Sequence, residues 1–169
     1  MIEQDFLKYS ADKLEQLSGR IQDCLGRLSS DQIWLRRSDN ENAVGNLVLH
    51  LCGNLSQWIG SGVAGKPDTR ERDAEFAARG AVTAADLAER LRRTVAETMA
   101  TIRTVPAERL SDKIMVQKYD VTVLYAIYHV VEHFAQHTGQ IIFATKLLTG
   151  QDLGYYNHLN QPKHFETTP

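Results

Sequence analysis

Histidine gives this sequence its clearest chemistry, because the neutral imidazole is a common ligand of divalent metal ions. The chain has six histidines, and two of them, His133 and His137, lie four residues apart. Residues with this spacing lie on one face of a helix, so both imidazoles can reach a single ion at about 2.0 to 2.1 Å. A third histidine, His50, lies in a separate apolar segment. His133 and His137 could therefore share one metal ion, and His50 could add a third ligand if its helix lies beside theirs.

All three histidines fall on apolar helical faces. His133 and His137 share theirs with Val130, Phe134, Ile141 and Ala144, and His50 shares its own with Leu47, Asn54 and Trp58. Buried imidazoles need partners for their ring nitrogens, and a metal ion is one such partner. A hydrogen-bonded core histidine is the ordinary alternative for any one of them. The metalloprotease motif HExxH is excluded, because Phe134 rather than a glutamate follows His133.

Several polar residues near these histidines have roles that the sequence leaves open. His129 lies one turn before His133, but the helical face turns by about 80° over eight residues, so we expect His129 to contact the ligands or to line a pocket rather than to bind the ion. Gln140 and Asn54 could orient an imidazole or a bound water, or have a purely structural role. Glu132 points about 100° away from His133, which suits solvent or a dimer contact. No catalytic residue is identified.

Helical periodicity predicts four helices that would position these residues. In the first, Leu7, Leu14 and Ile21 recur every seven residues, as in a helix with one buried stripe. The four helices cover about residues 7–28, 41–63, 83–105 and 123–149, with Thr83 as a capping residue and Gly150 as a stop. Because no segment predicts a convincing strand, the expected fold class is an all-α four-helix bundle.

The connections between these helices differ in length and character. Residues 66–82 are rich in charge and predict a solvated crossover with one short helical turn, long enough to run the length of the bundle between the second and third helices. Residues 107–120 have weak β-character and are expected to form an extended loop. The tail from residue 151 contains enough apolar residues to pack over the bundle.

Composition excludes several classes of protein. The chain has 169 residues, which predicts a single domain over residues 1–169, and a net charge of −2 with dispersed basic residues, which argues against nucleic-acid binding. It has no apolar run long enough to span a membrane and no secretory leader, so we expect a cytoplasmic protein without a membrane partner. Its two cysteines are not in a CxxC motif and indicate a reducing compartment.

The two histidine strings, over residues 46–58 and 128–142, resemble those of the DinB/YfiT-like superfamily of metalloenzymes, and more narrowly a branch catalogued as a domain of unknown function. The resemblance covers nearly the whole chain in helix order and length. It implies a four-helix bundle with a crossover between helices 2 and 3, and a homodimer. It also implies one metal ligand from the second helix, at His50, and two from the fourth, at His133 and His137, with Ile141 as the aliphatic residue that follows.

The resemblance also carries expectations about chemistry. Three neutral imidazoles leave a coordination position open, as in catalytic sites, and suit zinc or nickel. Characterised members of the superfamily use low-molecular-weight thiols, which implies a metal-dependent thiol transferase with a small-molecule substrate. A metal-activated hydrolase and a non-catalytic metal- or ligand-binding stress-response protein are the alternatives. The lack of an identifiable inward carboxylate beside the metal favours the non-catalytic alternative.

Overall fold

The computed structural model describes residues 2–161 and has four main helices, which confirms the predicted fold class. They are α1 (Ile2–Arg27), α3 (Val44–Leu55), α5 (Ala84–Thr104) and α6 (Val123–Thr149). The last turns of the second helix are π-helical, η1 (Ser56–Val63), so that helix ends at the predicted residue with a changed pitch. No helix within residues 2–161 is both long and apolar enough to cross a membrane.

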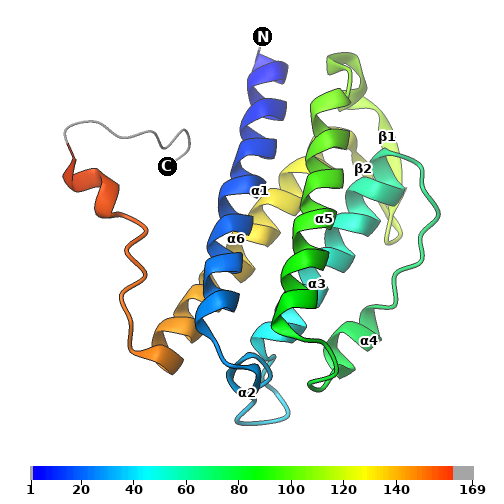
Figure 1. Ribbon diagram of the computed structural model, residues 1–169. Coiled ribbons are helices and arrows are strands. Elements are labelled where there is room, and N and C mark those ends of the chain that lie inside the picture. Colours follow the sequence, from blue (N-terminus) through cyan, green and yellow to red (C-terminus); the bar gives the residue numbers. More distant parts are fainter. Residues whose placement is uncertain (1, 162–169) are drawn as a thin grey trace.

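The core forms where the apolar stripes of these helices meet. The heptad residues Leu14 and Ile21 of α1 are fully buried, as are Leu91 of α5 and Phe134 of α6. Helix α1 packs against α5 and α6, and α3 packs against the same two helices, so α1 and α3 lie on a diagonal of the bundle. Helices α3 and α5 run in the same direction (Figure 1). The chain between them must therefore return along the bundle, which is the predicted crossover.

Local sequence signals explain where the helices begin and end. The side chain of Thr83 accepts a hydrogen bond from the Asp86 backbone N–H at 3.1 Å and starts α5. The side chain of Thr122 does the same for α6, with the Tyr125 N–H at 3.1 Å. Gly150 ends α6 in the left-handed conformation, with φ of 68°, which an amino acid without a Cβ adopts at little cost.

Two connections differ from the expectations. Residues 107–120 were expected to form an extended loop, but they contain the short helix η2 (Ala107–Ser111) and start an antiparallel hairpin of β1 (Lys113–Val116) and β2 (Tyr119–Thr122). The hairpin turns on Gln117 and Lys118, both at positive φ, a conformation that usually signals itself in sequence by glycine or asparagine. The absence of these residues explains why the turn was missed.

The crossover contains the predicted short helix, α4 (Arg72–Ala77), and most of its residues are exposed, as predicted. The side chains of Arg70 and Glu75 are 3% and 7% exposed. The remaining short helices of the described residues are α2 (Ser30–Ile33), which begins with a capping box at Ser29, and η3 (Asn157–Asn160). Among the charged residues of the crossover, the predicted exposure fails only at Arg70 and Glu75, because these two charges pair with each other in a buried position.

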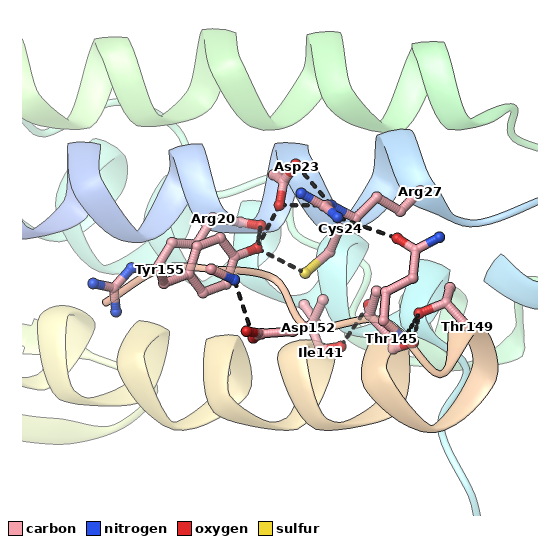
Figure 2. A network of polar contacts seen from close by, with 11 residues as sticks. Arg20, Asp23, Cys24, Arg27, Ile141, Thr145, Thr149, Asp152 and Tyr155 are labelled. Carbon is pink, nitrogen blue, oxygen red and sulfur yellow. Dashed lines mark hydrogen bonds and ion pairs between the residues drawn. The ribbon is translucent and has the colours of Figure 1, made fainter. Parts of the chain in front are cut away.

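The tail after α6 packs against α1 through a few residues, as Figure 2 shows. Leu153 is buried, and the Tyr155 hydroxyl lies 3.1 Å from the Arg20 carbonyl, 2.9 Å from Asp23 Oδ2 and 3.4 Å from Cys24 Sγ. The next aromatic residue, Tyr156, is exposed. The expected packing of the tail is therefore limited to its first part.

Candidate metal centre

The structure brings the three predicted ligands together between α3 and α6. His50 comes from α3, and His133 and His137 lie one turn apart on α6. One ring nitrogen from each lies within 4.8 Å of the other two. The closest pair is His50 Nε2 and His133 Nε2, which are 3.2 Å apart. Among residues 2–161 this is the one group of histidine, cysteine and carboxylate side chains that could hold a metal ion.

One pair of these nitrogens has the spacing expected for two ligands of a divalent ion. Two ligand nitrogens at 2.0 to 2.1 Å from a tetrahedral ion are separated by about 3.3 Å. The 3.2 Å separation of His50 Nε2 and His133 Nε2 is close to that value. His50 is buried and the two α6 histidines are half-buried, so the site faces both the core and a partly open side. Three nitrogens from two helices could hold a metal ion and leave further coordination positions on that open side.

The far ring nitrogen of His50 meets a buried carboxylate. His50 Nδ1 lies 3.1 Å from Glu75 Oε2 and 3.0 Å from Arg70 Nη2. Because a guanidinium only donates, a proton on His50 Nδ1 can be donated only to Glu75, which leaves Nε2 free to bind an ion. The Phe76 ring packs against the His50 imidazole at 4.7 Å between centroids. A metal-binding imidazole commonly has such a carboxylate partner.

Glu75 is itself fixed by its neighbours. Arg70 donates from Nε to Oε1 at 2.8 Å and from Nη2 to Oε2 at 2.9 Å, a bidentate ion pair. Burial raises the pKa of the Glu75 carboxyl, but the hydrogen bonds from Arg70 and His50 outweigh burial and hold that pKa below its usual value. Glu75 therefore carries a negative charge at neutral pH, directed at His50.

The other two histidines differ in how they are held. His137 Nδ1 lies 2.6 Å from Gln140 Oε1, so Gln140 orients an imidazole, one of the two roles that the sequence left open. His133 Nδ1 is buried and has no hydrogen-bond partner among the described residues. Burial, followed by the nearby His137 and His50, lowers the pKa of His133 to about 3, and burial also lowers the pKa of His137. Both are neutral at physiological pH, which is the form that binds metals.

The remaining polar candidates lie outside the cluster. The His129 ring packs at a tilt against Trp58, at 4.2 Å between ring centroids, and lies 5.5 Å from the His133 ring without joining the three-histidine group. Burial lowers the pKa of His129 as well. Asn54 is buried on α3, but the hydrogen bonds that orient His50 come from the crossover. Glu132 is exposed on α6.

Sequence reasoning missed Arg70 and Glu75, although α3 contained a signal for them. A Cβ at Gly53 would overlap the Glu75 carboxylate, so this mid-helix glycine makes room for it. Asn46 Nδ2 donates to the backbone carbonyl of Glu75 at 2.9 Å and to that of Ala78 at 3.1 Å. Asn46 and Gly53 share the helical face of His50, since they lie four residues before and three after it. An Asn, a His and a Gly on one face thus mark where the crossover docks.

Comparisons with solved structures agree with this fold. The chain is similar to a conserved protein from Enterococcus faecalis, with a TM-score of 0.72 and 17% identity over 85% of this chain and 97% of that one. It is also similar to YjoA, a DinB-like protein from Bacillus subtilis, with a TM-score of 0.66 and 15% identity over 90% of this chain and 97% of that one. A search of curated proteins found no similar sequence.

The second structure is consistent with the resemblance to the DinB/YfiT-like superfamily. At these identities the likeness concerns the fold alone. A comparison with family models covers almost the whole chain, matching residues 1–163 to a family described as a protein of unknown function, DUF1572. The chain therefore belongs to the DUF1572 family, with a DinB-like fold and a three-histidine group that could bind a metal ion.

Proposed function

We propose that this chain binds a divalent ion, zinc or nickel, through His50, His133 and His137, and uses it to transfer a small thiol to an electrophile. The observation that supports this most directly is the cluster of three imidazole nitrogens within 4.8 Å, with one of them backed by a buried carboxylate. A bound divalent ion would lower the pKa of a thiol or water in its open position. The choice of a thiol rests on the resemblance to the superfamily.

A cavity that shares Gln140 with the surroundings of His137 supports a small-molecule substrate. It has a volume of about 440 Å³, and Gln140, which contacts His137, forms part of its wall. Much of the remaining wall is apolar, with Val44, Leu47 and Phe143 among its residues. Leu47 lies one turn before His50 on α3. An electrophile with an apolar body would fit this cavity, whose Gln140 end lies nearest to His137.

Within the transfer, the chain's residues would bind and orient the reactants. The thiol sulfur forms the new bond to the electrophile, the leaving group departs with its bonding electrons, and the thiol proton passes to solvent. Glu75 cannot serve as a general base for this proton, because Arg70 and His50 engage its carboxylate. In this proposal Glu75 acts only on His50, the metal ligand that it contacts.

The three-histidine cluster also fits one alternative, a metal- or ligand-binding stress-response protein that catalyses nothing. An inward carboxylate does exist, contrary to the sequence expectation, but it faces the far nitrogen of His50 rather than the open side of the site. A metal-activated hydrolase would be supported by hydrolysis of an ester or amide in the absence of thiol. Turnover of an electrophile only with a thiol would support the transferase.

Elemental analysis of the purified, untagged protein tests the site itself, with His137→Ala as the comparison. About one equivalent of zinc or nickel per chain, lost in the variant, is the expected result. If neither protein retains metal after incubation with both ions, the metal-dependent functions are wrong and a ligand-binding or scaffolding role remains. If the metal is present, a screen of small thiols with a chromogenic electrophile then tests the transferase.

We also propose that the chain forms a homodimer through the exposed face of α6. Leu124 and Tyr128 lie four residues apart on this face and are 45% and 57% exposed. Glu132 continues the same face one turn later and is exposed too. Large exposed apolar side chains on one helical face are typical of a contact surface.

A further inference from the structure

The crossover is fixed to α3 on both sides of His50. On one side, Asn46 donates to the carbonyls of Glu75 and Ala78. On the other side, Gly53 leaves the space that the Glu75 carboxylate fills. A crossover that only connected two helices would not need a buried amide and a mid-helix glycine. Both features hold the carboxylate of Glu75 at one position relative to His50.

All three nitrogens of the Arg70 guanidinium donate hydrogen bonds in this arrangement. Two of its nitrogens hold Glu75, and Nη1 donates to Gln57 Oε1 at 2.9 Å. Gln57 in turn donates from Nε2 to Asp68 at 2.7 Å and accepts from Gln117 of the hairpin. Buried charges are costly to desolvate, so an ion pair kept in this position suggests a use other than stability.

We propose that Glu75 and Arg70 are positioning residues for His50, and that metal binding is coupled to docking of the crossover segment, residues 70–78. This inference rests on the proposed metal site and goes beyond it. A carboxylate that accepts from the far nitrogen of a metal-binding histidine fixes its tautomer and ring orientation and makes it a stronger ligand, an effect of about 10- to 100-fold in metal affinity. Arg70 fixes the carboxylate in turn.

The coupling is reciprocal. If docking of residues 70–78 strengthens metal binding by some factor, metal binding must strengthen docking by the same factor. The ion should therefore order a segment that contributes no ligand of its own. Backbone amides of α4 should exchange with solvent more slowly when metal is present, and the slowing should depend on Glu75 and Arg70.

The zinc dissociation constant, measured by competition with a chelator, tests the positioning role. Glu75→Gln should weaken zinc binding by about 10- to 100-fold. Glu71→Gln is the matched control, because Glu71 lies in the same segment, is exposed and makes no capping hydrogen bond. It should bind zinc like the wild type. If wild type binds no zinc, the metal site itself is wrong. If wild type and Glu75→Gln bind equally well, the positioning role is wrong.

A double variant separates positioning from folding, because Glu75→Gln leaves Arg70 buried without its partner. Replacing a buried ion pair with apolar residues of similar size is often neutral for stability. Arg70→Met with Glu75→Leu should therefore unfold near the wild-type temperature without metal and still bind zinc about 10- to 100-fold more weakly. Hydrogen exchange of residues 72–77 should then slow on zinc addition in wild type only. A stable double variant with wild-type affinity would overturn the proposal.

Discussion

At the scale of single residues, each histidine of the candidate metal centre has a different environment at its second ring nitrogen. His50 faces the buried Glu75, His137 faces the exposed Gln140, and His133 has no partner there within residues 2–161. A carboxylate partner strengthens a histidine ligand more than an amide does, because it carries a full charge. His50 is therefore expected to be the strongest of the three ligands.

A histidine-to-alanine series tests which imidazoles bind the ion. His50→Ala, His133→Ala and His137→Ala should each lose the metal, because two remaining imidazoles cannot replace a third ligand. His129→Ala should retain it, since His129 packs on Trp58 outside the cluster. Metal content by elemental analysis gives the answer. Retention in all four variants would contradict the assignment, and loss in His129→Ala would add a ligand to it.

Cys52 gives a second prediction for a single residue. It is buried on α3, and burial raises the pKa of its thiol to about 11. Since the thiolate is the reactive form, only about one molecule in a thousand would be ionised at pH 8. In a Cys24→Ala variant, which leaves Cys52 as the chain's single cysteine, a disulfide reagent at pH 8 should react slowly with the native protein and completely after unfolding. Rapid reaction of the native protein would contradict this.

The same pKa has a defined effect on stability. A thiol whose pKa is raised by folding keeps its proton in the native state after the unfolded chain has begun to lose it. Stability from this group is therefore present below pH 9, the ordinary pKa, and declines as the pH rises from about 9 towards 11. Stability falls as the pH rises because, between about pH 9 and 11, the folded state binds more protons than the unfolded state.

At the scale of elements, periodicity was sufficient to predict the four long helices. Each has one apolar stripe facing one core, so a sequence pattern and a buried surface correspond directly. It was also sufficient to place His133 and His137 on one face of α6. The proximity of His50 to this pair came from the family resemblance, because spacing along the chain says nothing about which helices become neighbours.

The buried ion pair of the crossover and the hairpin could not be predicted from periodicity. Charge in a short segment usually means exposure, and most of residues 66–82 follow that rule, but Arg70 and Glu75 do not because they neutralise each other in a buried pair. The hairpin has strands of only four residues each, and its turn lacks the glycine or asparagine that normally marks such turns. Both features depend on contacts with α3 or η1, which a local pattern does not contain.

Glycine substitutions test the docking of the crossover. Alanine is the better helix former by about 1 kcal/mol, so Gly19→Ala, in open space on α1, should stabilise the protein by up to that amount. Gly53→Ala should do the opposite, because the new Cβ overlaps the Glu75 carboxylate and Arg70 Nε. We expect a loss of about 1–3 kcal/mol, measured by urea unfolding. A stabilised Gly53→Ala protein would contradict the described docking.

At the scale of the whole molecule, the homodimer is the property that remains to be measured. Sedimentation velocity should give a mass twice that of the chain. Tyr128→Glu should shift the equilibrium to monomer, because it places a charge on the proposed contact face of α6. Tyr9→Glu is the control, as Tyr9 is exposed to a similar extent, 47%, on α1. A monomeric wild type, or a dimer that survives Tyr128→Glu, would exclude this face as the interface.

The order of the histidines along the chain also determines when the candidate site can exist. His50 and His133 are separated by 83 residues, and both α6 histidines lie in the last long helix. During synthesis on the ribosome, α1, α3 and α5 are complete before either α6 histidine emerges. Contacts between such distant segments close late in folding. An ion that needs all three imidazoles could therefore bind only after α6 has packed against α3, late in the assembly of the bundle.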